Sequence, residues 1–258
     1  MKITRIESCV ISVPYQHGGP YPVIGGKAWD TMDSLLVRVE TDSGAVGWGE
    51  SFGYNAIAST KAALDAIVAP LFIGQSFIGQ DATNIAELNF QAQQKLQNFG
   101  RTGAMIFALS GIDIALWDIA GQVAQQPLYK MLGGKHTDKA PVYASLLRYG
   151  DAKLVADNCA RAVERGYRMI KLHEIEEPMV CAARQAIGPG IALTVDTNCP
   201  HRFDGALAMA KSFAPHDLLW LEEPLWPPED WEMASSTALS ASFRKQGTTR
   251  PFIGCSPR

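Results

Sequence analysis

Hydrophobic and polar positions follow two periodic patterns in the first half of the chain, one typical of strands and one typical of helices. Apolar residues in Ile3–Val13 and in Ser34–Glu50, which turns at Asp42-Ser43-Gly44, predict a strand and a hairpin. From Thr60 to Leu132 apolar residues recur three and four positions apart, which predicts helices. The pair Gly133-Gly134 ends that helical region.

After Lys139 short apolar runs alternate with helical segments. The runs are Val142–Leu147, Met169–Leu172, Ile191–Val195 and Leu218–Leu221. The expected helices between them are Ala152–Arg165, Met179–Ile187 and Gly205–Ala214. Strand and helix alternating in this way predict βα units with a parallel sheet, so the fold class is α/β.

Polar residues stand at the carboxyl ends of three predicted strands. Lys171 and His173 end the second, Asp196 and Asn198 the third, and Glu222 the fourth. In a (β/α) barrel these ends form one face, on which catalytic residues converge. Solvated strand ends would explain any one of them, but the set favours a site.

The residue types at these ends indicate metal-assisted proton transfer. Asp196 and Glu222 lie one βα unit apart, and two carboxylates on neighbouring strands suit Mg²⁺. Lys171 and His173, two positions apart, project to one side of the sheet, where a cationic lysine favours a neutral histidine base. Such a base would take a proton next to a carboxylate bound to the metal.

Composition and charge narrow the classes of function. The 258 residues are 47% apolar and 19% charged, with a net charge of −3, as in ordinary globular proteins. All 26 acidic residues precede Met233, so the body is acidic and nucleic-acid binding is not expected.

We expect a cytoplasmic protein that does not bind membranes, because the chain has no secretory signal and no uninterrupted run of about 18 apolar residues. Its five cysteines form no Cys-x-x-Cys pair and predict neither a disulfide framework nor a zinc knuckle.

Several motifs together resemble one family. The motifs are Ala108–Gly121 followed by Pro127–Gly134, and then Gly47-Trp-Gly-Glu50, Lys171-Leu-His173, Asp196-Thr-Asn198 and Leu221-Glu-Glu-Pro224. Their residues are similar to those of the mandelate racemase/muconate lactonizing enzyme group of the enolase superfamily. The resemblance covers residues 1 to about 231. It implies an N-terminal α+β capping domain over residues 1–132, a partial, about half-complete TIM-type barrel over 140–232, and one essential Mg²⁺. It also implies abstraction of the proton α to a carboxylate, leading to racemisation, cycloisomerisation or dehydration.

The resemblance assigns roles residue by residue. Asp196 and Glu222 match the first two metal ligands. Lys171 and His173 match the catalytic Lys-x-Lys pair, with His173 where many relatives have a lysine base. Asn198 resembles a residue beside the metal that can touch substrate.

Two segments resemble the capping-domain loops that close over substrate. They are Pro14–Asp30, with His17, Tyr21 and Lys27, and Ser51–Tyr54. A loop as long as Pro14–Asp30 is otherwise a mobile surface loop. The polar side chains favour a sugar acid, and therefore a dehydratase.

The family pattern stops before the fifth barrel strand. Residues 233–258 contain four basic and no acidic residues, and Arg250–Ser256 only weakly resembles that strand, with Ser256 near the place of the third acidic ligand. We therefore expect a frameshifted tail, weakly held Mg²⁺ and catalysis that is impaired by loss of the third metal ligand and the later strands. Three alternatives stay open: an active lyase or isomerase that is a possible homo-oligomer, a non-catalytic fragment, and an interaction protein that pairs through an open barrel edge.

Other conspicuous residues have ordinary explanations. We expect His136, His201 and His216 to be solvated in loops or at helix ends. Trp220 and Trp226 are expected to pack at the barrel mouth.

Overall fold

The computed structural model describes residues 1–24, 26–73, 84–134, 137–227 and 253–254 of the chain. Two compact units divide it. Unit 1 consists of Met1–Tyr15 and Val23–Asp138, and unit 2 of Gln16–Pro22 and Lys139–Arg258. Residues 16–22, from the expected lid loop, thus group with unit 2.

Unit 1 is built on the antiparallel sheet β1-β4-β5, and a small hairpin, β2 and β3, interrupts the segment expected to be a loop. The strands are β1 (Ile3–Pro14), β2 (Val23–Ile24), β3 (Lys27–Ala28), β4 (Thr31–Thr41) and β5 (Val46–Ser51). The helical elements are η1 (Tyr54–Ala56), α1 (Ile57–Ala63), η2 (Leu64–Val68), α2 (Ala69–Phe72), α3 (Ile85–Leu96), η3 (Gln97–Phe99), α4 (Ala104–Ala124) and α5 (Leu128–Met131). The expected strand, hairpin and helices are confirmed.

Helix α4 packs on β5 at very short range. A Cβ at Gly49 would lie 2.0 Å from the carbonyl oxygen of Gly111, and one at Gly47 would lie 2.1 Å from that of Ala115. Only glycine fits such an approach, which explains the spacing of the Gly47-Trp-Gly-Glu50 motif. In the described part of the chain, α4 alone is long and apolar enough to cross a membrane, and nine of its residues are buried in unit 1.

Unit 2 is a five-stranded parallel sheet in the order β10-β9-β8-β7-β6. The strands are β6 (Ala144–Ser145), β7 (Met169–Leu172), β8 (Ala192–Asp196), β9 (Trp220–Glu222) and β10 (Ile253–Gly254). The helical elements are α6 (Ala152–Glu164), α7 (Glu177–Ile187), α8 (Phe203–Phe213) and η4 (Ala214–His216). The predicted parallel βα arrangement is confirmed, although β6 is much shorter than its apolar run.

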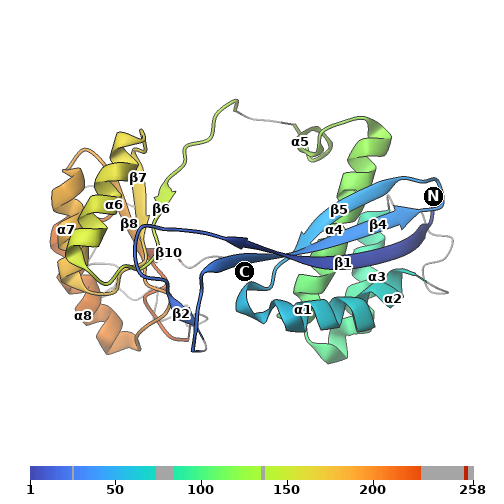
Figure 1. The fold of residues 1–258 in the computed structure, drawn as a ribbon, viewed down its shortest axis with the longest axis horizontal. Coiled ribbons are helices and arrows are strands. Elements are labelled where there is room, and N and C mark those ends of the chain that lie inside the picture. Colours follow the sequence, from blue (N-terminus) through green and yellow to red (C-terminus); the bar gives the residue numbers. More distant parts are fainter. Residues whose placement is uncertain (25, 74–83, 135–136, 228–252, 255–258) are drawn as a thin grey trace. The chain divides into compact units, whose positions relative to one another are not determined.

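The two faces of this sheet carry different side chains. α6, α7 and α8 cover one face (Figure 1), where Ile170, Leu172 and Val195 are completely buried in the core of the unit. Because side chains alternate along a strand, Lys171 and Asp196 project to the opposite face. A side-chain cap stabilises the start of α6, where Asp151 accepts a hydrogen bond from the Leu154 amide at 2.8 Å.

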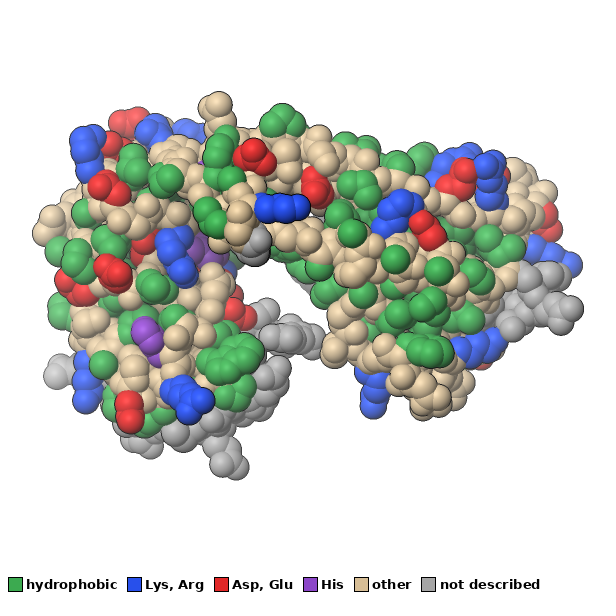
Figure 2. Space-filling view, turned by 60° about the horizontal axis from the view of Figure 1, so that its bottom comes forward, with side chains coloured by type: hydrophobic (Ala, Val, Ile, Leu, Met, Phe, Trp, Pro, Cys, Tyr) green, Lys and Arg blue, Asp and Glu red, His purple; other side chains and the backbone are tan. Residues whose placement is uncertain are grey.

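The tail lies almost entirely outside the described residues, and so do Ser256 and the expected frameshift. Its described part, β10, pairs in parallel with β9 and places Gly254 beside Glu222. A fifth strand is therefore present at the predicted place. Elsewhere, Figure 2 shows acidic and basic side chains interspersed among the described residues of the face in view.

Candidate active site

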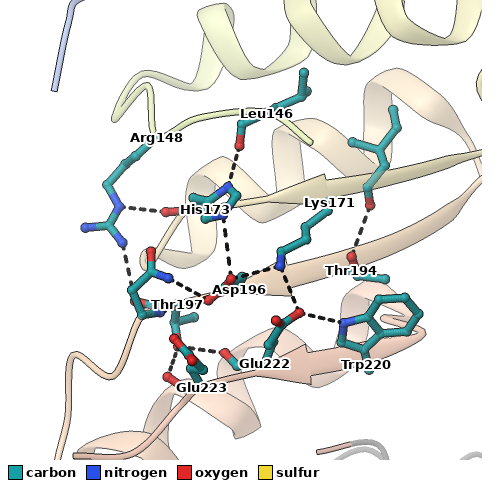
Figure 3. Close-up of polar contacts among 12 residues, drawn as sticks. Leu146, Arg148, Lys171, His173, Thr194, Asp196, Thr197, Trp220, Glu222 and Glu223 are labelled. Carbon is teal, nitrogen blue, oxygen red and sulfur yellow. Dashed lines mark hydrogen bonds and ion pairs between the residues drawn. The ribbon is translucent and has the colours of Figure 1, made fainter. Parts of the chain in front are cut away.

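The charged residues at the strand ends meet on the face of the unit 2 sheet opposite α6, α7 and α8 (Figure 3). The Lys171 ammonium lies 2.9 Å from Asp196 Oδ2 and 3.0 Å from Glu222 Oε2. Asp196 and Glu222 are register partners on β8 and β9, which explains why their oxygens converge on one point. The side chains of Lys171, Asp196 and Glu222 are only 10%, 9% and 19% exposed.

Lys171 is held in its charged form. Burial lowers the pKa of its ammonium, but hydrogen bonds to Asp196 and Glu222, together with their negative charges, outweigh burial and raise that pKa above its usual value. A protonated lysine cannot accept a proton. Lys171 therefore supplies positive charge at this point.

His173 presents its second ring nitrogen to the same place. Its Nδ1 lies 2.7 Å from the carbonyl oxygen of Leu146, and because a carbonyl only accepts, Nδ1 carries the proton. In the neutral ring Nε2 is then unprotonated, and it lies 3.6 Å from Asp196 Oδ2. The carbonyl group of Leu146, just after β6, thus selects the tautomer in which Nε2 can act as a base.

Asn198 fixes the orientation of Asp196. Its backbone amide and its Nδ2 donate to Asp196 Oδ1 at 3.1 and 2.8 Å, which leaves Oδ2 for Lys171. Asn198 has a φ of +56°, a left-handed conformation that asparagine tolerates better than most residues. In this structure Asn198 holds a carboxylate.

The site also contains residues that the sequence analysis missed. Trp220, expected only to pack, donates from Nε1 to Glu222 Oε2 at 3.2 Å. Arg148 donates from Nε to the carbonyl oxygen of His173 at 2.6 Å and from Nη2 to that of Thr197 at 3.3 Å, and so ties the ends of β7 and β8 together. The period-2 pattern, which puts Trp220 on the same face as Glu222, was the available signal for the tryptophan. No comparable signal marked Arg148.

Glu174, next to His173, anchors the connection after β6. It is 1% exposed and accepts a hydrogen bond from the Tyr149 amide at 2.6 Å. Burial raises the pKa of Glu174, and the hydrogen bonds from the amides of Tyr149 and Gly150 only partly oppose it. Tyr149 is also buried, which raises the pKa of its phenol to about 12 and keeps it a hydrogen-bond donor.

The four predicted lid residues divide between the units. In unit 2, His17 stacks on Tyr149 with ring centroids 5.3 Å apart, and the Tyr149 hydroxyl donates to the carbonyl oxygen of His17 at 3.0 Å. Tyr21 lies 5.9 Å from His17, ring to ring. In unit 1, Lys27 is on β3, and Tyr54 packs 5.0 Å from Trp29.

The donor set fits Mg²⁺. Two carboxylate oxygens, Asp196 Oδ2 and Glu222 Oε2, converge within hydrogen-bond distance of one cationic group, and the point they share suits a cation. Hard oxygen ligands with room for water and substrate are what Mg²⁺ prefers.

Comparison with known proteins identifies the family. Residues 6–133 match the mandelate racemase/muconate lactonizing enzyme N-terminal domain, and residues 154–245 match the enolase C-terminal domain-like family. The chain belongs to the enolase superfamily. Its place is in the mandelate racemase/muconate lactonizing enzyme group, as the motifs suggested.

Two of the sequence relatives are named for a sugar acid and for a sugar-acid lactone. Arabinonate dehydratase of Saccharolobus solfataricus is 31% identical over 78% of this chain and 55% of its own length. D-galactarolactone cycloisomerase of Agrobacterium fabrum is 31% identical over 89% of this chain and 60% of its own length. The chain therefore spans little more than half the length of these curated relatives.

A solved structure of the superfamily contains the expected metal. A racemase from Streptomyces coelicolor with bound magnesium superposes with a TM-score of 0.80 at 27% identity, over 98% of this chain and 68% of that one. Enolase-superfamily members use Mg²⁺, and the fold at this site is theirs.

Proposed function

We propose that this chain carries an active site that removes the proton α to the carboxylate of a sugar acid, with dehydration as the overall reaction. One observation carries the proposal: His173 Nε2, left basic by the Nδ1 hydrogen bond to Leu146, faces the pair formed by Lys171 and Asp196. The dehydratase and cycloisomerase relatives support a sugar acid as substrate.

Each site residue has a defined part in this proposal. His173 Nε2 accepts the proton from the α carbon. The Lys171 ammonium places positive charge beside the electron-rich enediolate that results. The β-hydroxyl group then leaves as water, taking up the proton that His173 Nε2 removed from the α carbon, and the enol that remains tautomerises to the 2-keto acid. Asn198, Trp220 and Arg148 keep the carboxylates and strand ends in place.

Asp196 and Glu222 would hold Mg²⁺, which supplies positive charge to the substrate carboxylate and makes the α proton more acidic. We expect the ion to be held weakly, because Gly254, not a carboxylate, lies beside Glu222 in the described part of the next strand. His17, Tyr21, Lys27 and Tyr54 are proposed to contact the substrate, and the cytoplasmic location remains a prediction.

The test is exchange of the α proton in deuterated water. The full chain is incubated with Mg²⁺ and a panel of five- and six-carbon aldonic and aldaric acids, and NMR follows both deuterium at the α carbon of the acid and formation of the 2-keto product. We expect Mg²⁺-dependent exchange, reduced about 10²- to 10⁴-fold by His173→Asn, which removes the base. Lys211→Met, on the exposed side of α8, is the matched control and should exchange normally.

Two outcomes would contradict the proposal. Absence of both exchange and 2-keto product with the folded wild-type chain across the panel would exclude α-proton abstraction from these acids. Undiminished exchange by His173→Asn would exclude His173 as the base.

A further inference from the structure

A second group of metal-binding side chains lies on the helical side of unit 2. Glu177 and Cys181 are on α7, and His216 is in η4. Their ligand atoms all lie within 4.8 Å of one another, and His216 Nε2 is 2.6 Å from Glu177 Oε1. The His216 side chain is 12% exposed, so the expectation that it is solvated was wrong.

The fold prepares this arrangement. Glu177 and Cys181 are four residues apart on α7 and therefore lie on one face of the helix. Arg184, further along α7, donates to the carbonyl oxygen of His216 at 2.9 Å and to that of Asp217 at 3.0 Å. The backbone that carries His216 is thus fixed to the helix that carries the other two side chains.

The distances are close to those of a coordinated ion. Tetrahedral Zn²⁺ with bonds of about 2.0–2.3 Å sets neighbouring ligand atoms about 3.3–3.7 Å apart. The three ligand atoms reach this spacing if the 2.6 Å contact lengthens and the wider separations shorten by about an ångström or less.

The ligand chemistry differs from that of the active site. A thiolate, an imidazole and one carboxylate favour Zn²⁺ and related transition metals, whereas Mg²⁺ takes oxygen ligands. We propose that Glu177, Cys181 and His216 form a Zn²⁺ site with water as the fourth ligand, separate from the Asp196–Glu222 site. The ion links α7 to the turn before β9 and so fastens two successive βα units together. This proposal does not depend on the proposed function.

Zinc binding at these residues must release protons. The thiol of Cys181 and Nε2 of His216 coordinate only when unprotonated, so affinity rises with pH. Because the site exists only in the folded chain, Zn²⁺ should also raise the melting temperature.

The test uses Co²⁺ as a spectroscopic probe of the full chain, under reducing conditions and in excess Mg²⁺. We expect one equivalent of Co²⁺ to produce visible bands of tetrahedral cobalt and a thiolate-to-metal charge-transfer band, both removed by Zn²⁺. Cys181→Ser should abolish the charge-transfer band and weaken Zn²⁺ binding by more than about tenfold, the lower end of the loss that even outer-shell partners of a metal produce. Cys9→Ser, at an exposed cysteine of unit 1, is the matched control and should change neither.

Two further variants distinguish loss of Zn²⁺ binding at these residues from misfolding of the chain and from metal binding at the active site. Glu177→Gln keeps the thiol and should weaken Zn²⁺ binding while retaining the charge-transfer band. Asp196→Asn combined with Glu222→Gln should leave the band intact. Absence of the band in the wild-type chain, its survival in Cys181→Ser, or its loss in an Asp196/Glu222 variant that circular dichroism shows to be folded would each overturn the proposal.

Discussion

Unit 1 and unit 2 differ in the charged side chains that they bury. Among the described residues of unit 1, the buried polar side chains are the uncharged Thr41, Ser51 and Thr60, and ion pairs such as Lys61–Asp65 are exposed. Unit 2 buries Lys171, Glu174 and Asp196. All three lie on β7 or β8, or just after them.

The difference places the buried charges of the described residues in the unit that carries the candidate site. Burying a charge carries a desolvation penalty that only a well-placed partner offsets. A buried charge without such a partner therefore lowers the free energy of unfolding. Clusters of buried charges in a cleft or at strand ends are typical of functional sites. Unit 1 is held by apolar packing, and unit 2 combines such packing with a buried charge network.

The largest expected effect comes from removing the central cation of unit 2. Lys171→Met leaves Asp196 and Glu222 close together without their positive partner, and we expect the free energy of unfolding to fall by about 3–5 kcal/mol in metal-free solution. Urea denaturation measures this loss. Lys211→Met is the exposed control and should have little effect.

Added Mg²⁺ provides a second test of the Lys171→Met prediction. If Mg²⁺ binds the same two carboxylates, it should stabilise Lys171→Met more than the wild-type chain, in which it competes with the ammonium. A Lys171→Met chain as stable as Lys211→Met without metal would show that the charge network contributes little.

The second effect tests packing in unit 1. Gly49→Ala places a methyl group 2.0 Å from the Gly111 carbonyl oxygen, and we expect a loss of about 1–3 kcal/mol from overpacking, measured by urea denaturation. Gly190→Ala in unit 2 is the matched control, because its Cβ meets no atom within 4 Å. Equal stabilities of the two variants would contradict the close approach of α4 and β5.

The third effect is a pH dependence that arises from a buried carboxyl group of unit 2, Glu174. Because the pKa of Glu174 is raised in the folded chain, the folded state binds its proton more tightly than the unfolded state does. The contribution of Glu174 to stability is therefore greatest below its ordinary pKa of about 4.3, and it is lost as pH rises through the raised folded value. Glu174→Gln should flatten this part of the stability–pH curve. An unchanged slope would assign the dependence to other groups.

The smallest effect concerns an exposed ion pair of unit 1. Lys61 Nζ and Asp65 Oδ2 are 2.6 Å apart, with side chains 38% and 47% exposed. Solvent screens such a pair, so Asp65→Asn should change the free energy of unfolding by less than about 1 kcal/mol, and less still in high salt. A loss as large as that of Lys171→Met would remove the contrast between the units.

Local patterns predicted much of the fold. The apolar run Met169–Leu172 is β7 residue for residue, and the turn at Asp42-Ser43-Gly44 joins β4 to β5 as expected. The pattern overestimated β6, because only Ala144 and Ser145 of its apolar run pair with β7. Pairing depends on the neighbouring strand, which a single run of residues does not contain.

The candidate site was predictable in its residue types and only partly in its contacts. The spacing of Asp196 and Glu222 is one βα unit, and parallel pairing of β8 and β9 necessarily brings two such strand ends together. The ring nitrogen of His173 that carries the proton could not be predicted, since it depends on a backbone carbonyl 27 residues away.

By itself the sequence determined the alternation of strand and helix and the face on which each polar side chain lies, because both follow from spacing along the chain. Tertiary structure alone decided that Lys171 bridges two carboxylates and that His216 meets Glu177 across 39 residues. It also decided that residues 16–22 pack with unit 2. These contacts join segments whose distance in space is set by the packing of whole elements, which no local pattern records.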